Sequence, residues 1–519
     1  MSEFTFRVLP STTKKIPAGE AGCAFLVEDN WDDWFTYSTM YSLVVFDKDG
    51  ERHDIGSVKI GEFQADGEKN RRPGIPKSFT KLDEKFFSLG QDDSYYDSLN
   101  KLKPSFKRYI LNGLNDLAVD QNLFERAQHQ DITQTSLLRS ITPATVRGQF
   151  KRLAEGGARL SNYHFSYTAP RQVATSEEPL SISFDVEAES NPPSNIHVLI
   201  GRNGVGKTYL LDRMANALVG EKITRRKFGV FSSLDDEDAG SLFANLISVT
   251  FSAFDQFIPI AGSDSKTKYH YIGLKQIETD GSIAQAPKSP DMLTGDFVES
   301  MKMCLRGPRK ERWNRAIAQL ESDPIFREAG IADLGIKLSL HLKNATEFGK
   351  IARSTFKRLS SGHKIVLLTI TKLVELVAER SLILLDEPEA HLHPPLLGAF
   401  VRALSDLLVN RNGVAIIATH SPVVLQEVPR KCAWKLRRHG SIAVAERPDL
   451  ETFGENTGVL TREVFGLEVI KSGYHKLITE ALDGDKTYDQ VIADFGNEVG
   501  AEAKAIIRTL IATRRSQVS

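Results

Sequence analysis

Alternating apolar and polar residues predict β-strands in two parts of the chain. Near the N-terminus the runs FTFRVL, CAFLVED and YSLVVF alternate in this way, and a turn at residues 47–50 joins the last of them to HDIGSVKI. A second run of this kind, LSISFDVEA, precedes the short apolar strand IHVLI at residues 196–200. We therefore expect a small antiparallel sheet at the N-terminus and further strands just before residue 200.

Helical spacing of apolar residues dominates other parts of the chain. Between residues 78 and 160 apolar side chains recur at intervals of three and four, for example at Phe106, Ile110 and Leu114, which predicts a helical block. A similar pattern covers residues 297–320. From residue 357 to 422 helix-like segments alternate with the apolar strands SLILLDE and GVAIIAT. Such alternation is typical of a parallel sheet covered by helices.

The composition is that of a globular protein and argues against several classes. Hydrophobic residues make up 41% of the chain, and 66 basic residues balance 67 acidic ones, so the chain as a whole has no basic excess for nucleic acid. The 3 cysteines are far apart and odd in number, which does not support a disulfide framework. No run approaches the ~18 apolar residues that a spanning helix needs. We expect a cytoplasmic protein without membrane segments.

A phosphate-binding loop is the strongest motif. Residues 201–208 read GRNGVGKT and lie between the strand IHVLI and a helix-like segment, which matches the pattern G-x-x-x-x-G-K-[ST]. In such a loop backbone N–H groups surround the β-phosphate, and the following helix directs the positive end of its dipole to the same anion. Lys207 is expected to bridge the β- and γ-phosphates, and the Thr208 hydroxyl to ligate Mg²⁺. The candidate nucleotide-binding residues here are Gly201, Asn203, Gly204, Gly206, Lys207 and Thr208.

Two further candidate groups follow apolar strands. Asp386 and Glu387 end the run SLILLDE, and His420 comes directly after GVAIIAT. Ligands of parallel sheets collect at the carboxyl ends of the strands. In that position Asp386 would hold Mg²⁺, Glu387 would orient or deprotonate the attacking water, and His420 would contact the γ-phosphate. The alternatives are an ordinary acidic turn and a capping or core histidine.

The order of these motifs resembles that of the ABC ATPase head. The phosphate loop is followed by LSSGH at residues 359–363, then by LLDEPEAHLHP and ATHSP, and the likeness is to the branch of SMC, RecF-like and OLD-like proteins. The resemblance implies an α/β fold with a mixed or parallel sheet that carries the phosphate loop, an antiparallel β subdomain and helical insertions. It also implies ATP and Mg²⁺ as ligands and ATP hydrolysis, fast or slow, as the activity.

The same resemblance implies that two copies of the chain share each nucleotide. In this family the signature of one subunit, usually LSGGQ, lies at a helix N-terminus and completes the ATP site of the other. Ser360 and Gly362 would take that role here, and the sequence departs from the family pattern at Ser361 and His363. Considered alone, LSSGH is an ordinary helix cap.

Three more roles follow from the resemblance. The family has a glutamine that senses the metal and the γ-phosphate, for which Gln256 is the candidate. An aromatic residue before the phosphate loop commonly stacks on adenine, and Tyr167 or Phe165 could do so, although either could equally be a core residue. His391 and His393 lie in the loop that couples two heads, where a structural role is favoured over a metal site because no third ligand follows at a recognisable spacing.

These expectations divide the chain into six segments, of which residues 196–422 carry the resemblance. The flanking segments match only loosely. The segments are an antiparallel β segment, either separate or part of the ATPase head (1–77), a helical block (78–160), a head lobe with the phosphate loop (161–216), an insertion with the Gln256 strand and a helical arm (217–356), a head lobe with the signature, the acidic pair and His420 (357–428), and a C-terminal hairpin with a helical tail (429–519).

Stand-alone heads of this kind resemble the ATPase subunits of anti-phage systems such as Septu and the retron-associated pairs. The resemblance implies an ATP-sandwiched homodimer that regulates a separate effector, such as an HNH nuclease or a toxin. Two alternatives stay open. One is a RecF-like repair or recombination ATPase that binds DNA directly, and the other is a transporter ATPase subunit, which LSSGH and the HLHP loop disfavour.

Overall fold

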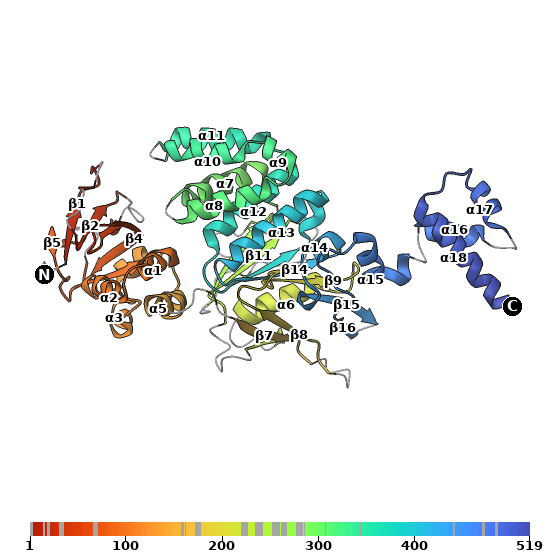
Figure 1. The fold of residues 1–519 in the computed structure, drawn as a ribbon, viewed down its shortest axis with the longest axis horizontal. Helices are drawn as coiled ribbons and strands as arrows, with labels where there is room; N and C mark the ends of the chain where they lie inside the picture. The colour runs from red at the N-terminus through yellow and green to blue at the C-terminus, as the bar shows by residue number, and fades with distance from the viewer. Residues whose placement is uncertain are drawn as a thin grey trace.

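The computed structural model shows an N-terminal domain, a central α/β domain and a group of C-terminal helices arranged in a row, with the two chain ends at opposite extremes (Figure 1). It describes residues 4–518 apart from short stretches. These are 14–15, 18–20, 31–35, 66–70, 157–159, 161, 172–177, 220–226, 234–241, 252–259, 261–266, 277–283, 285, 307, 343, 440–441, 470–472 and 483–485.

A six-stranded sheet in the order β5-β1-β2-β3-β4-β6 forms one layer of the N-terminal domain. The expectation of a wholly antiparallel sheet is wrong in one pairing, because β1 and β2 run parallel. The connection between them, residues 10–22, is long enough for the crossover that parallel pairing requires. The strands are β1 (Thr5–Leu9), β2 (Cys23–Glu28), β3 (Met40–Phe46), β4 (Arg52–Glu62), β5 (Ser78–Phe79) and β6 (Phe86–Gly90).

Helices pack on this sheet and share its core. Tyr95 and Tyr96 of α1 are fully buried against it, together with the apolar faces of α2 and α3. Residues 1–77 and 78–160, expected as separate segments, therefore build one domain, and β5 and β6 lie where only helices were expected. The elements are α1 (Asp93–Asn100), α2 (Pro104–Gly113), α3 (Gln121–Ala127), η1 (Thr133–Leu137), α4 (Pro143–Thr145), η2 (Val146–Phe150) and α5 (Lys151–Ala154).

The central domain contains a seven-stranded sheet in the order β12-β11-β13-β14-β9-β15-β16. All its neighbours are parallel except the C-terminal hairpin β15–β16, so the expected α/β class with a largely parallel sheet is confirmed. Its strands are β9 (Ile196–Ile200), β11 (Asn245–Thr250), β12 (Lys268–Gly273), β13 (Ser381–Asp386), β14 (Val414–Thr419), β15 (Ala433–His439) and β16 (Ile442–Glu446).

Both faces of this sheet are buried, which explains why its strands are continuously apolar. Leu382 and Leu384 of β13 face a layer made of α6 (Lys207–Val219) and a three-stranded antiparallel sheet in the order β10-β7-β8. Ile383 and Leu385, on the opposite face, pack against helices. The small sheet is the expected antiparallel β subdomain and consists of β7 (Tyr163–Thr168), β8 (Ser181–Val186) and β10 (Val230–Ser233).

The second face carries α12 (Ser361–Leu376), α13 (Pro394–Val409) and, above them, a helical arm (Figure 1). Trp313 of the arm is fully buried, and its indole N–H donates to the Thr371 hydroxyl of α12 over 3.1 Å. The pattern at residues 297–320 corresponds to the first two arm helices. They are α7 (Pro290–Cys304) and α8 (Pro308–Leu320), followed by α9 (Pro324–Glu328), α10 (Ile331–Leu340) and α11 (Ala345–Arg358).

The C-terminal part begins with the expected hairpin and continues as helices. The last three helices share a small core of their own around Ile478, Val491 and Ile507. Among the described residues, no helix combines the length and the apolar character needed to cross a membrane. The remaining elements are η5 (Pro388–His391), α14 (Pro422–Gln426), η6 (Arg430–Cys432), α15 (Thr457–Val469), α16 (Gly473–Ala481), α17 (Tyr488–Asp494) and α18 (Ala501–Val518).

Candidate nucleotide-binding site

Three motifs meet at the carboxyl edge of the central sheet because their strands are neighbours. β14 lies between β9 and β13, and all three run parallel. The phosphate loop follows β9, Glu387 follows β13, and His420 follows β14. Segments far apart in the sequence therefore come to one place, the edge at which ligands of parallel sheets bind.

The glycines of the phosphate loop have two different physical roles. Gly204 and Gly206 adopt φ values of +82° and +97°, which favour glycine, and an added Cβ at either would meet nothing within 4 Å. Gly201 is required by packing, because a Cβ there would lie 2.5 Å from the carbonyl oxygen of Leu436 on β15. The loop leads directly into α6, so its amides and the helix N-terminus can face one anion.

Lys207 is held inside the loop. Its side chain is 3% exposed, and Nζ donates to the carbonyl oxygens of Gly201 at 3.1 Å and Arg202 at 3.0 Å. Burial lowers the pKa of the ammonium, whereas the carboxylates of Glu387 and Asp386 oppose that shift. Glu387 Oε1 lies 3.8 Å from Nζ. The cation and the acidic pair predicted from the sequence are thus side by side.

Glu387 has an unusual backbone conformation. Its φ of 43° and ψ of 58° lie in the left-handed region, which a residue with a side chain rarely adopts and which costs on the order of 1–3 kcal/mol. The turn is maintained because the Glu387 N–H donates to the Ala418 carbonyl at 2.9 Å and Pro388 begins η5 at once. Glu387 Oε1 lies 3.7 Å from His420 Nδ1. The strained turn directs this carboxylate to the space between Lys207 and His420.

Glu389 is a site residue that the sequence motifs did not single out. Its Oε1 accepts from the Thr419 hydroxyl at 2.5 Å and from the His420 N–H at 2.8 Å, and it lies 3.2 Å from His420 Nδ1. The Glu389 side chain is 8% exposed, whereas that of His420 is 44% exposed. A buried carboxylate therefore fixes the end of β14 and the imidazole that follows. The one sequence feature that could have identified Glu389 is its position two residues after Glu387.

The signature LSSGH starts α12. The Ser360 hydroxyl accepts from the His363 N–H at 3.3 Å and lies 3.0 Å from His363 Nδ1, so Ser360 is the N-cap. His363 packs edge-on against Phe326 of α9, with ring centroids 5.6 Å apart, which gives the departure from LSGGQ a structural role within the chain. A Cβ on Gly362 would lie 2.6 Å from the carbonyl oxygen of His391. The signature thus contacts the turn that follows the acidic pair.

The remaining sequence candidates have different outcomes. Gln256 lies outside the described residues. Phe165 and Tyr167 are fully buried in the core, where the Tyr167 hydroxyl donates to the Phe228 carbonyl. Of the two alternatives for these residues, the structure supports the core role and not stacking on adenine. His393 Nε2 lies 3.2 Å from the Asp323 carboxylate, a contact that joins the HLHP turn to the N-cap of α9.

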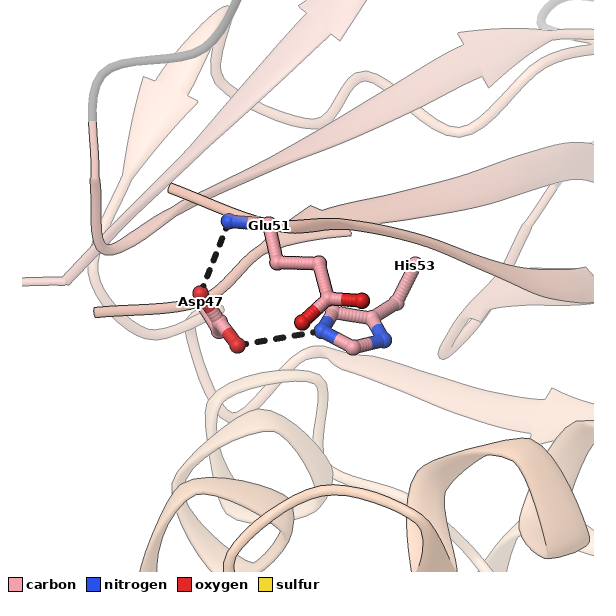
Figure 2. Close-up of side chains that lie close together, drawn as sticks. All are labelled: Asp47, Glu51 and His53. Atoms are coloured by element: carbon pink, nitrogen blue, oxygen red, sulfur yellow. Dashed lines mark hydrogen bonds and ion pairs between the residues drawn. The ribbon is translucent and has the colours of Figure 1, made fainter. Parts of the chain in front are cut away.

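Within the described ranges, a possible metal-ligand group is found elsewhere, at the turn between β3 and β4 (Figure 2). It comprises Asp47, Glu51 and His53. Asp47 Oδ1 already accepts the backbone N–H groups of Asp49 and Glu51, each at 2.9 Å, and Oδ2 lies 3.1 Å from His53 Nε2. These bonds account for the cluster as a stabilised hairpin turn, and we assign no metal to it.

Comparisons with known proteins found a family model and several solved structures that are similar to parts of this chain. Residues 325–426, from α9 to α14, match the family model described as "AAA domain, putative AbiEii toxin, Type IV TA system". Similar solved structures include a nucleotide-free ATP-binding cassette of an ABC transporter, which is 14% identical with a TM-score of 0.29 and covers 60% of this chain and 100% of that chain. The SMC head domain from Thermotoga maritima is 11% identical with a TM-score of 0.26, covering 56% of this chain and 99% of that chain.

A relative with much closer similarity is protein ea59 of Escherichia phage lambda. It is 42% identical over 515 residues, which cover 96% of this chain and 97% of that protein. The alignment therefore spans the N-terminal domain, the central domain and the C-terminal helices alike. The chain therefore belongs to the family of the phage lambda protein ea59.

Proposed function

We propose that this protein hydrolyses ATP and that its active form is a dimer with ATP bound between two copies. The observation that carries the proposal is the meeting of Lys207, Glu387 and His420 at one sheet edge. Glu387 Oε1 lies 3.8 Å from Lys207 Nζ and 3.7 Å from His420 Nδ1. A buried cation, a carboxylate and an imidazole around an open glycine loop are the groups that phosphoryl transfer to water requires.

The described residues fit a magnesium nucleotide. The loop at Gly204 and Gly206 leaves open space where a side chain would otherwise stand, and Lys207 is positioned beside it. Thr208, in the first turn of α6, and Asp386, at the end of β13, would hold Mg²⁺, which when bound neutralises phosphate charge. Gln256 stays a proposed third member of this metal shell.

In the hydrolytic step Glu387 would accept a proton from the attacking water. Its carboxylate is one-third exposed and close to the sheet edge, so a water between it and the γ-phosphate can be oriented there. His420 would donate a hydrogen bond to the γ-phosphate. Glu389 acts as a positioning residue, since it holds the backbone and the ring of His420.

The signature helix supports the dimer. Ser360 and Ser361 are exposed at the N-terminus of α12, a helix of 16 residues whose first-turn amides and dipole favour an anion. We propose that Ser360 and Gly362 of one copy cover the phosphates bound to Lys207 of the other. The contact between Gly362 and the His391 carbonyl would then link each signature to the turn beside the acidic pair of its own chain.

We also propose that the nucleotide state of the dimer regulates a separate effector protein in anti-phage defence. The family model that matches residues 325–426 is named for a toxin of a type IV toxin–antitoxin system, which supports a role in a system of more than one component. Affinity purification from the native host should therefore recover a nuclease or toxin together with this chain. Recovery of DNA bound by the chain alone, with a steep dependence on salt, would instead favour the repair ATPase.

Glu387→Gln tests the central claim. This variant should bind ATP with Mg²⁺ and stay dimeric in light scattering, because the dimer forms but hydrolysis stalls. Lys207→Ala should lose ATP binding at the phosphate loop and remain monomeric. Glu299→Gln, which changes an exposed glutamate of α7 paired with Lys302, is the matched control and should hydrolyse ATP like the unchanged protein. A Glu387→Gln protein that binds ATP and stays monomeric would contradict the proposal.

A further inference from the structure

A cavity of about 630 Å³ lies between the N-terminal domain and the central domain, far along α12 from the signature. The N-terminal domain contributes residues of β3, β4 and the loop after η1. The central domain contributes the start of α8 and the last turn of α12. Its volume falls within the range of about 300–1,000 Å³ that is usual for small-molecule sites.

The lining of this cavity has an excess of positive charge. Six basic side chains face three acidic ones, Asp29, Asp92 and Glu375. One of the acids is already shared, because Asp92 lies 2.6 Å from Arg312 and 3.7 Å from Arg411. The basic residues are Lys59, Arg139, Arg306, Arg309, Arg312 and Arg411.

Arg309 lies beside another cation of the lining, Arg312. Among the described residues, no carboxylate lies within 4 Å of its guanidinium. Burial and Arg312 lower the pKa of Arg309, and the more distant carboxylates of Asp92 and Glu375 oppose this shift only in part. Burial also lowers the pKa of Arg306, where the Asp29 carboxylate opposes the shift and Arg139 adds to it. Placing partly buried cations beside each other is unfavourable unless an anion compensates them.

Two more arginines of the lining are largely buried. The side chains of Arg312 and Arg411 are 13% and 7% exposed, and both lie within ion-pair distance of Asp92. Arg411 also pairs with Asp93 at 2.7 Å. An oxyanion is the acceptor that guanidinium groups bind best, often through two parallel hydrogen bonds.

The rest of the lining is apolar. Phe150 and Ile141 from the N-terminal domain and Leu376 and Val377 from the central domain present hydrocarbon surface to the same space. A lining of this mixture suits a ligand with an anionic end and an apolar, flat body. Inorganic phosphate alone would leave most of the volume unfilled.

We propose that this interdomain cavity binds a small phosphorylated molecule of the nucleoside phosphate class. Its phosphate would lie on Arg306, on Arg309 and Arg312 of α8 and on Arg411, and its body against Phe150 and Leu376. The site is separate from the phosphate loop, and the proposal does not depend on ATP hydrolysis there. Because Leu376 ends the helix that Ser360 begins, a ligand here contacts the element that carries the signature.

Full-length Lys207→Ala protein provides the test, since loss of the phosphate-loop lysine leaves the interdomain cavity as the expected site. AMP, pyrophosphate and adenosine are titrated separately by calorimetry. We expect AMP to bind with one site per chain, and Arg309→Gln in the same background to weaken it about tenfold or more, as the loss of a hydrogen bond to a charged group predicts. Arg315→Gln, on an exposed position of α8, is the matched control and should leave AMP affinity unchanged.

The other outcomes count against the proposal. The absence of AMP binding at concentrations up to about 1 mM would overturn it. Equal effects of Arg309→Gln and Arg315→Gln would show that binding is not at the cavity. If pyrophosphate binds and AMP does not, the proposed contact with a nucleoside is wrong. If adenosine binds as tightly as AMP, the proposed contact with a phosphate is wrong. Thermal unfolding identifies variants that fail to fold, in which case Arg306→Gln takes the place of Arg309→Gln.

Discussion

Single side chains at the sheet edge act through the neighbours that hold them. The His420 side chain is less than half exposed, and Glu389 binds both its N–H and its ring. Lys207 and Glu387 are held in the same way, the first by loop carbonyls and the second by a strained turn. Substitutions at the positioning residues should therefore affect catalysis more than nucleotide binding.

Glu389→Ala should lower kcat for ATP hydrolysis by up to about a hundredfold, because a small displacement of His420 is enough to remove a productive contact. The KM for ATP should change little, since the phosphate loop is untouched. Glu389→Gln keeps an acceptor for the Thr419 hydroxyl and the His420 N–H and should recover most of the loss. Steady-state kinetics of both variants make the check, and equal loss in both would refute the positioning role.

Asp116 provides a pH-dependent prediction for the N-terminal domain. It is buried, accepts from the Ala118 N–H at 2.9 Å, and lies 3.2 Å from the Tyr96 hydroxyl. Burial raises its pKa from 3.8 to about 7. At a pH between these two pKa values, Asp116 is protonated in the folded state and ionised in the unfolded state. The free energy of unfolding therefore falls as the pH rises through this window.

Asp116→Asn should remove this pH dependence, because an amide makes the same contacts without ionising. The variant should gain stability relative to the unchanged protein between about pH 4 and about pH 7, by up to a few kcal/mol. Calorimetric unfolding across this range measures the difference. Parallel stability curves for the two proteins would show that Asp116 ionises normally in the folded state.

At the scale of elements, α12 connects several features. Its N-cap is Ser360, its first turn packs on η5 through Gly362, its middle meets the arm through Trp313, and its last turn lines the interdomain cavity. A rigid helix with these four contacts cannot shift at one end without affecting the others.

Gly362→Ala and Gly349→Ala form a matched pair that isolates the contact with η5. Helix propensity alone favours alanine by about 1 kcal/mol, so Gly349→Ala in α11, where an added Cβ meets nothing within 4 Å, should stabilise the protein. Gly362→Ala should destabilise it and slow ATP hydrolysis, because its Cβ would lie 2.6 Å from the His391 carbonyl oxygen. Thermal unfolding compares the two variants. If both variants shift the unfolding temperature in the same direction, the contact between Gly362 and η5 does not constrain the helix.

At the scale of the whole molecule, buried ion pairs join the N-terminal domain to the central one. Arg411 lies 2.7 Å from Asp93, Arg312 lies 2.6 Å from Asp92, and Arg152 lies 2.7 Å from Glu379. Each pair has one partner in each domain. The two domains are therefore expected to unfold together.

Arg411→Ala should uncouple them. Removing Arg411 takes from Asp93 its ion pair at 2.7 Å, and breaking a buried pair in this way costs about 3–5 kcal/mol. Calorimetry should therefore show two unfolding transitions in place of one. Arg52→Ala, which breaks an exposed pair with Asp54 within the N-terminal domain, is the control and should keep a single transition. A single, unshifted transition in Arg411→Ala would mean that the ion pairs do not hold the domains together.

Local patterns in the sequence were enough to predict most of the secondary structure and the main motifs of the site. Continuous apolar runs marked β9, β13 and β14 because both faces of the sheet are buried, and the phosphate loop was legible because its glycines serve a local backbone conformation. The hairpin β15–β16 and the arm helices α7 and α8 follow from periodicity in the same way.

The amino-acid sequence by itself determined the class of the central domain, the identity of the phosphate loop and the acidic pair, since each depends on neighbours within a few residues. Only the tertiary structure decided that Glu389 holds His420, that Phe165 and Tyr167 are core residues, that β1 pairs parallel to β2, and that arginines from separate helices and loops enclose one cavity. The physical reason is that burial and charge compensation depend on which distant segments pack together, and no short sequence window records that.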